Sequence, residues 1–166
     1  MIVFDLEATC WETGQTVDRQ EIIEIGAVRL GTPDEFGRFV RPVGEPTLSA
    51  FCTQLTGITQ ADVDPARTFP EVFPEFLAWI GDGALASWGA YDIKQLRADC
   101  RRHAIPFPER LADGHVNLKT VFADRHHCKP CGMAKALRML RIPLDGTHHR
   151  AIDDARNIAK IAAVSI

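Results

Sequence analysis

The sequence predicts a single α/β domain with a mixed central sheet flanked by helices. Three observations support this fold class. The chain has 166 residues, its first 41 residues contain three strand-like segments joined by short turns, and the remainder alternates helical patterns with one more strand. A chain of this length, with 46% hydrophobic residues and a net charge of −3, can bury a core of its own. We therefore assign residues 1–166 to one domain.

The three N-terminal strands are expected at Ile2–Leu6, Glu21–Leu30 and Phe36–Arg41, where apolar and β-branched residues are dense. Residues 31–34 have the composition of a tight turn. The short connections indicate an antiparallel meander, which supplies one half of the mixed sheet.

A helical period begins at Phe69 and keeps apolar residues on one face as far as Ile80. Thr68 and Glu71 have the spacing of a capping box at its start. Pro74 lies inside the pattern, so we expect a kink or a late start there.

The second half of the chain continues with a strand at Ala84–Trp88 and a helix at Asp92–His103. Further helices are expected around residues 118–122, at residues 133–140 and at about Ile152–Ala163, each with one apolar face. Helices that alternate with a strand after a meander are typical of a layered α/β domain.

The composition of the chain argues against a membrane-spanning or secreted protein. No apolar run approaches the roughly 20 residues needed to cross a bilayer. The N-terminus has no basic stretch before an apolar core, so no signal peptide is expected. Five cysteines without regular spacing favour a reducing cytoplasm over a secreted disulfide framework.

Charge is divided unevenly along the chain. Residues 1–83 carry 5 Lys and Arg against 14 Asp and Glu, whereas residues 84–166 carry 14 against 8 and all six histidines. The net charge of −3 argues against a nucleic-acid partner, but the division suggests an acidic site facing a basic surface. The alternative is that the uneven charge only reflects a solvated surface and has no functional role.

Asp5 and Glu7 lie two residues apart on the first predicted strand, so their side chains share one face. Two carboxylates on a hydrophobic strand are costly to bury without a cation, and oxygen ligands suit Mg²⁺ or Mn²⁺. Taken alone, an Asp-x-Glu pair is more often the solvated face of an edge strand.

Four more residues become informative only through their order along the chain. Asp92 follows a strand and opens a helix, where an acid is the usual capping residue. Asp153 and Asp154 have the same interpretation at the start of the last helix, and His149 could be a solvated loop residue.

The order Asp-x-Glu, Asp, His-x-Ala-x-x-Asp resembles the DEDDh family of 3′→5′ exonucleases, with Asp5, Glu7, Asp92, Asp154 and His149 at the motif positions. The spacing from His149 selects Asp154 over Asp153. Other segments resemble the Eri-type exoribonuclease branch of this family, and together they cover nearly the whole chain: Phe4–Cys10, Glu21–Gly26, Phe39–Pro42, Phe51–Ile58, Ser87–Asp92 and Ile152–Ala159.

The resemblance implies a ribonuclease H-like fold and a mechanism that uses two divalent cations, Mg²⁺ or Mn²⁺. It implies that Asp5 bridges both ions, that Glu7 and Asp154 hold the ion of the nucleophile, and that Asp92 acts mainly through water. His149 would be the general base, a role that a near-neutral pKa suits.

The resemblance also suggests residues that contact the substrate. Leu6, Ala8 and Thr9 surround Glu7 in the segment that meets the terminal nucleotide, and Phe51, Leu55 and Trp88 are candidates for stacking or wedging bases. Ordinary core packing is an equal alternative for the last three. The basic residues Lys94, Arg97, Arg101 and Arg102 could follow phosphates, although a solvated helix face is the better interpretation.

One cysteine–histidine cluster is not expected to bind zinc. His126, His127, Cys128 and Cys131 provide only half a site, because no second ligand pair has a recognisable spacing.

The sequence thus predicts a metal-dependent 3′→5′ exonuclease that acts on nucleic acid with a free 3′ end. Single-stranded or 3′-overhang RNA is the favoured substrate, and DNA, as in proofreading or repair exonucleases, is the alternative. A non-catalytic binding module on the same fold would be expected to lack one of the four acids, and none is missing. The sequence does not identify which proteins, if any, bind this chain.

Overall fold

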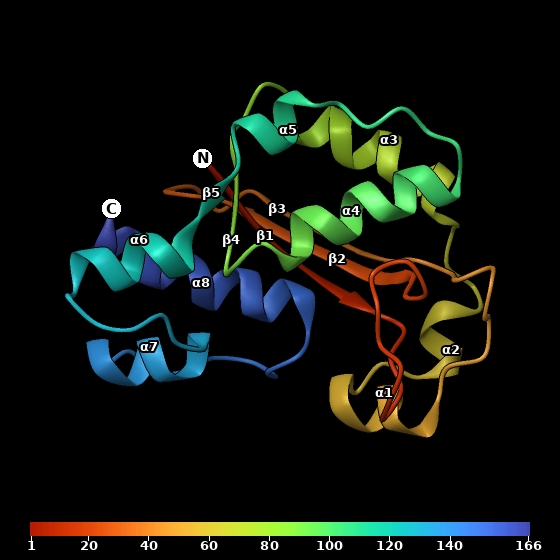
Figure 1. The fold of residues 1–166 in the computed structure, drawn as a ribbon, viewed down its shortest axis with the longest axis horizontal. Coiled ribbons are helices and arrows are strands. Elements are labelled where there is room, and N and C mark those ends of the chain that lie inside the picture. The colour runs from red at the N-terminus through yellow and green to blue at the C-terminus, as the bar shows by residue number, and fades with distance from the viewer.

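The computed structural model describes residues 1–166 and shows a five-stranded sheet in the order β3-β2-β1-β4-β5 (Figure 1). The strands are β1 (Ile2–Ala8), β2 (Ile22–Arg29), β3 (Glu35–Phe39), β4 (Leu85–Ser87) and β5 (Val116–Asn117). The first three pair antiparallel, whereas β4 and β5 add in parallel. The predicted meander and mixed sheet are therefore confirmed, with β1 at the centre.

Helices cover both faces of this sheet (Figure 1). One face carries α3 (Phe69–Ile80), α4 (Tyr91–Arg102) and α5 (Arg110–Asp113), and the other carries α6 (Leu118–Arg125), α7 (Met133–Leu140) and α8 (Ala151–Ser165). Two short helices, α1 (Ala50–Thr56) and α2 (Gln60–Val63), lie together beyond the end of β1.

Alternation along β1 divides the core into two layers. Ile2, Phe4 and Leu6 point into the cluster beneath α3 and α4. Val3 points the other way, into the cluster beneath α6, α7 and α8. Side chains two residues apart share a face, so Asp5 and Glu7 point with Val3 towards α8.

Helix α3 begins where the capping box predicts. The carboxylate of Glu71 accepts hydrogen bonds from the backbone nitrogen of Thr68, at 2.8 Å, and from its hydroxyl, at 2.7 Å. The helix includes Pro74, so the expectation of a late start is wrong. Pro74 and Pro70 are both exposed, and the carbonyl that Pro74 leaves without a helical partner can therefore bind water.

The start of α8 lies directly against β2. A Cβ atom at Gly26 would lie 2.2 Å from the backbone carbon of Ala151 and 2.2 Å from the backbone nitrogen of Ile152, so only glycine allows this approach. Gly26 pairs with Asp5 across the sheet. The absence of a side chain at Gly26 therefore brings the first turn of α8 over the middle of β1.

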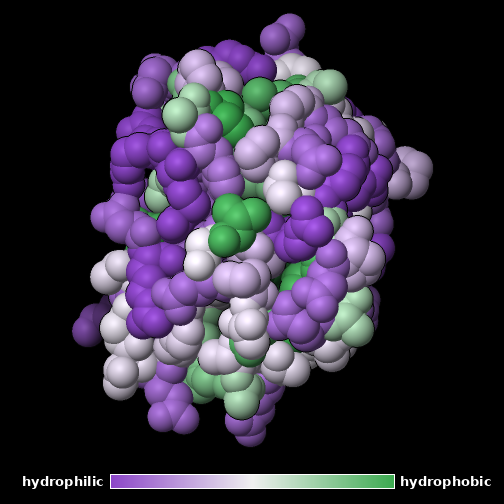
Figure 2. Space-filling model, turned by 90° about the vertical axis from the view of Figure 1, so that its right-hand side faces the viewer, coloured by the Kyte–Doolittle hydropathy of each residue, from purple (hydrophilic) through white to green (hydrophobic).

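None of the helices is both long and apolar enough to span a bilayer. The face that carries α1 and α2 at its lower end is mostly hydrophilic, with hydrophobic residues in separate patches (Figure 2).

Candidate active site

A cleft of about 330 Å³ opens where the C-terminal half of β1 meets the first turns of α4 and α8. Seven residues that the sequence singles out line it: Asp5, Leu6, Glu7, Trp88, Asp92, His149 and Asp154. Five further residues complete the wall: Tyr91, Gly132, Met133, His148 and Ile158. Segments from both halves of the chain therefore meet at one place.

Three carboxylates form the centre of the cleft. One oxygen each of Asp5, Glu7 and Asp154 can be chosen so that all three lie within 4.8 Å of one another. Asp5 and Glu7 are half-buried on β1, whereas Asp154, in the first turn of α8, is only 5% exposed. The helix contact at Gly26 brings these acids together, although Asp154 follows Glu7 by almost the length of the chain.

Asp92 is held against β1 by a backbone hydrogen bond. Its Oδ1 atom accepts from the backbone nitrogen of Leu6 at 3.2 Å, and its side chain is buried. Strand β4 pairs only with Ile2 and Val3, so the nitrogen of Leu6 has no strand partner there. Asp92 satisfies this donor and thereby comes to the edge of the acidic cluster.

A buried acid on β2 fixes the entry into α8. The carboxylate of Glu24 accepts a hydrogen bond from the backbone nitrogen of Ala151 at 2.9 Å and forms two 3.1 Å contacts with the guanidinium of Arg150. The helix has no side-chain cap of its own, so Glu24 takes that role from the sheet. Sequence reasoning missed Glu24, because nothing in its local pattern shows that it faces a helix 127 residues away.

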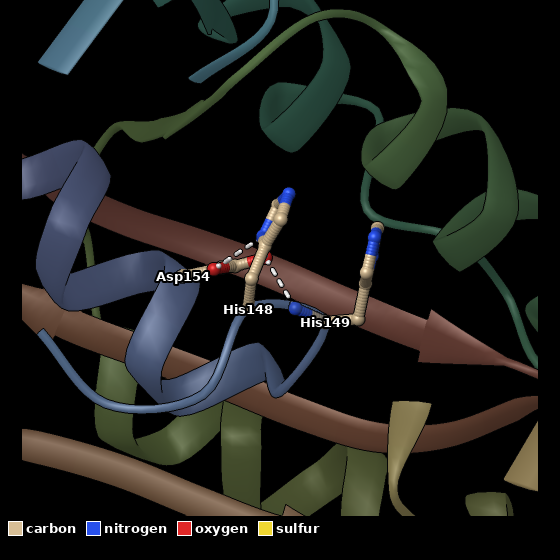
Figure 3. A group of neighbouring side chains, drawn as sticks. All are labelled: His148, His149 and Asp154. Carbon is tan, nitrogen blue, oxygen red and sulfur yellow. Dashed lines mark hydrogen bonds and ion pairs between the residues drawn. The ribbon is translucent and has the colours of Figure 1, made fainter. Parts of the chain in front are cut away.

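Two adjacent histidines lie beside Asp154 (Figure 3). The Nδ1 atom of His148 lies 2.8 and 3.0 Å from the two carboxylate oxygens of Asp154, and the backbone nitrogen of His149 donates to the same carboxylate at 3.1 Å. Their rings stack with centroids 4.0 Å apart and an interplanar angle of 18°. His149 was expected here from its spacing; His148 was not.

Burial and crowding raise the pKa values of all four acids. Burial raises the pKa of Asp5 well above its usual value, and the nearby charges of Asp92, Glu7 and Asp154 raise it further. Burial, followed by the charge of Asp154, raises the pKa of Glu7 to about 8. Burial raises the pKa of Asp92 to about 6, and it also raises the pKa of Asp154 despite the neighbouring histidines.

This arrangement fits divalent cations. All four acids offer oxygen ligands, which hard cations prefer, and bound positive charge would remove the mutual repulsion that raises their pKa values. Burial lowers the pKa of His149, so its ring is neutral near pH 7, as a general base requires. The site can therefore hold cations beside a base.

Of the predicted substrate contacts, Leu6 and Trp88 line this cleft, and the other four lie outside it. Ala8 and Thr9 are buried, and the hydroxyl of Thr9 accepts a hydrogen bond from the backbone nitrogen of Glu21 at 2.9 Å. Phe51 packs partly against the small cluster around α1 and α2, whereas Leu55 is 40% exposed on α1. Trp88, on the cleft wall, donates from Nε1 to the carbonyl of Cys131 at 2.9 Å.

The basic residues of α4 mostly have acidic or carbonyl partners. Arg97 pairs with Glu109, Arg101 pairs with Asp18, and Arg102 donates to backbone carbonyls at 2.7 and 2.9 Å. Only Lys94 is exposed without such a partner. This pattern fits the interpretation of a solvated helix face.

The cysteine–histidine segment does not gather its four side chains into one cluster. His126 instead contacts the hydroxyl of Ser165 at 3.1 Å and packs on Phe122. Cys131 is buried in the core beneath α7.

Curated proteins of similar sequence carry exonuclease names. The chain is 32% identical to mouse ERI1 exoribonuclease 2 over 98% of its own length and 28% of that protein. It is 33% identical to human 3′-5′ exoribonuclease 1 over 96% of its own length and 50% of that protein, and 30% identical to the Drosophila 3′-5′ exonuclease Snipper. The chain thus spans about half, or less, of the length of the exoribonucleases it matches.

Solved structures agree in fold. The nuclease domain of 3′hExo, a DEDDh family member bound to rAMP, is 31% identical with a TM-score of 0.89, over 97% of this chain and 88% of that one. A 3′-exonuclease whose structure shows 3′-end-specific recognition of a histone mRNA stem-loop is 30% identical with a TM-score of 0.89, over 97% of this chain and 61% of that one. These domains confirm the ribonuclease H-like fold. Residues 2–162 match the RNase_T exonuclease family, and the chain belongs to that family.

Proposed function

We propose that this chain is a 3′→5′ exonuclease that releases nucleoside 5′-monophosphates from single-stranded or 3′-overhang RNA. The observation that carries the proposal is the convergence of four carboxylates and His149 in one cleft. Family membership and the exoribonuclease names of the relatives support the reaction type and favour RNA.

The proposed cofactors are two divalent cations, Mg²⁺ or Mn²⁺, held by Asp5, Glu7, Asp92 and Asp154. When bound, such ions lower the pKa of water and stabilise negative charge on the leaving oxygen. The role of the protein is to hold the acids in place through Gly26, Glu24 and the Leu6 backbone. His149 takes the proton of the attacking water, for which its lowered pKa keeps the ring neutral.

We propose that the strand end, and not the strand interior, provides most of the binding. The exposed side chain of Leu55 and the ring of Trp88 on the cleft wall are the surfaces on which bases would pack, with Phe51 beside α1. Leu6, Ala8 and Thr9 would place the terminal nucleotide mainly through backbone contacts. Because the arginines of α4 are already paired, we expect weak binding to duplex without a free 3′ end.

We further propose that residues 1–166 act as one exonuclease domain in the cytoplasm. The three hydrophobic clusters share the same sheet, and all five cysteines are free thiols.

The test uses 5′-labelled RNA and DNA oligomers of equal sequence with Mg²⁺ or Mn²⁺. We expect stepwise shortening from the 3′ end, a higher kcat/KM for RNA, and loss of shortening with EDTA. Asp154→Ala should lose the activity, whereas Asp124→Ala, which removes an exposed acid on α6, should keep it. No shortening of either polymer, or equal activity of Asp154→Ala and wild type, would refute the proposal. A higher kcat/KM for DNA would replace RNA with the DNA alternative.

A further inference from the structure

His148 has no part in the proposed exonuclease chemistry, yet it lies in direct contact with Asp154. One ligand atom each from His148, His149 and Asp154 can be chosen so that all three lie within 4.8 Å of one another. Figure 3 shows both rings on the same side of the loop, with the ring of His148 beside the carboxylate and the ring of His149 farther from it. Asp154 therefore belongs to two clusters, one made only of oxygen donors and one that offers two imidazoles.

The loop that carries these histidines is held in place by α8. The backbone nitrogen of Thr147 donates to Asp153 at 2.9 Å, and that of Asp145 donates to Asn157 at 3.1 Å. His149 has a φ of +66°, in the left-handed region that residues other than glycine rarely adopt. This conformation, fixed by the bond from its nitrogen to Asp154, accompanies the stacking of the two rings.

The donor set differs from that of the acidic cluster. Carboxylate and water oxygens suit Mg²⁺ and Mn²⁺, whereas imidazole suits Zn²⁺ and related transition metals. Zinc sites with two histidines and one carboxylate are known, with zinc–ligand distances of about 2.0–2.2 Å, which places neighbouring tetrahedral ligands about 3.3 Å apart. The observed 2.8 and 3.0 Å contacts between His148 and Asp154 need to widen by only a few tenths of an ångström. The His149 nitrogen lies within 4.8 Å of the other two ligand atoms, so it must approach by up to about 1.5 Å, and the stacked rings must turn towards the ion. The His148 side chain, 42% exposed, has room to move.

We propose that His148, His149 and Asp154 form a binding site for an imidazole-preferring divalent ion, Zn²⁺ or one of its class, and that occupation of this site stops the exonuclease. The second half of this proposal rests on the proposed function. A neutral imidazole has one free lone pair, so a His149 ring that binds zinc cannot accept a proton from water. Zinc on Asp154 also competes for an oxygen that the catalytic cations need.

The first experiment measures metal binding alone, on the full metal-free chain. Co²⁺ serves as the spectroscopic probe and Zn²⁺ as the competitor that displaces it. Besides ions held by the oxygen ligands of the acidic cluster, we expect one site whose absorption shows tetrahedral or five-coordinate nitrogen and oxygen ligation without a thiolate charge-transfer band, which separates it from Cys128 and Cys131.

His148→Gln is the test variant and His127→Gln is the matched control, because His127 is an exposed histidine outside the cluster. We expect His148→Gln to weaken Zn²⁺ binding by about tenfold or more and His127→Gln to leave it unchanged. In His148→Gln the bond from the His149 nitrogen to Asp154 remains, so the loop should stay folded, and circular dichroism checks this. Unchanged Zn²⁺ affinity in a folded His148→Gln, or a thiolate band in wild type, would overturn the site.

The second experiment measures Zn²⁺ inhibition of RNA shortening at fixed Mg²⁺, with each variant compared with its own uninhibited rate. The zinc concentration for half-inhibition should rise about tenfold in His148→Gln and stay the same in His127→Gln. Equal inhibition of both variants would mean that zinc acts at the acidic cluster, which overturns the inhibitory role. Because binding is measured without substrate, a chain that binds zinc through His148 but never shortens RNA would refute the proposed function and leave the metal site standing.

Discussion

Replacement of Gly26 by alanine tests the contact on which the whole site depends. The added Cβ would lie 2.2 Å from two backbone atoms of α8, in Ala151 and Ile152. Ordinary contact begins at 3.4 Å, so the start of the helix must move by about 1.2 Å or the strand must bend. Backbone atoms cannot rotate away as a flexible side chain can, so the displacement reaches Asp154 and His149.

The expected losses are in activity and in stability. A misplacement of about 1 Å in a catalytic group can lower a rate by about 100-fold, so we expect kcat of Gly26→Ala to fall by about that factor. Overpacking of this kind costs about 1–3 kcal/mol, so the free energy of unfolding should decrease by at least that much. Bonds from Glu24 to Arg150 and Ala151 oppose the movement, which adds to the loss of stability.

Gly37→Ala is the matched control. Gly37 lies on the neighbouring strand β3, where it pairs with Gly26. A Cβ atom added at Gly37 would lie 3.8 Å from a side-chain atom of Ile152, which is an ordinary contact. Initial rates on 5′-labelled RNA and urea denaturation of both variants make the comparison. A Gly26→Ala variant with activity within threefold of wild type, or equal destabilisation by the two substitutions, would refute the reasoning.

Three further predictions concern the acids, the base and the strand end. Because burial and Asp154 raise the pKa of Glu7 to about 8 in the folded protein, its protonation stabilises the metal-free fold at low pH, and this stabilisation is lost as the pH rises from 4.5 towards 8. Glu7→Gln should therefore raise Tm in EDTA at pH 8 by about 3 °C or more and by less at pH 5, while the exonuclease activity disappears. A Tm of Glu7→Gln below that of wild type in EDTA at pH 8 would contradict this. Because burial lowers the pKa of His149 below its usual 6.5, kcat/KM should stay level from pH 8 to 7 and fall only below 6.5, when Mg²⁺ saturates the acids at every pH; a profile at saturating Mg²⁺ that already declines between pH 8 and 7 would exclude a neutral His149 as the base. Leu55→Ala should raise KM for RNA by about 3- to 10-fold, because it removes apolar contact with a base, and should leave Tm unchanged, since Leu55 is exposed; a KM within twofold of wild type would remove Leu55 from the binding surface.

The parts of the fold that were predictable carry strong local signals. The strand at β2 is dense in isoleucine, and α3 begins with a capping box and repeats its apolar residues at helical spacing. The period of two on β1 was enough to place Asp5 and Glu7 on one face, and the structure confirms this. The short elements were missed, because four-residue helices such as Gln60–Val63 and a two-residue strand at Val116–Asn117 show no measurable period.

The site was predictable as a set of residues but not as a set of contacts. Order and spacing identified Asp154, yet no sequence pattern shows that Glu24 caps its helix or that Leu6 holds Asp92. His148 was missed for the opposite reason, since the motif assigns a role only to its neighbour His149. Contacts between residues that lie 86 to 127 positions apart depend on tertiary packing, which local patterns do not encode.

The placement of α8 across β1 also determines when the proposed nuclease activity can first arise during synthesis of the chain. The meander uses only the first 39 residues and can form early, because its contacts are local. The fourth acid and the base lie near position 150, so they reach the cleft only after the loop through α7 has been made and closed. A chain interrupted before His149 would hold three of the acids and no base. Partial products of translation would therefore be unable to degrade nucleic acid. Exonuclease activity would appear only after the complete domain has folded.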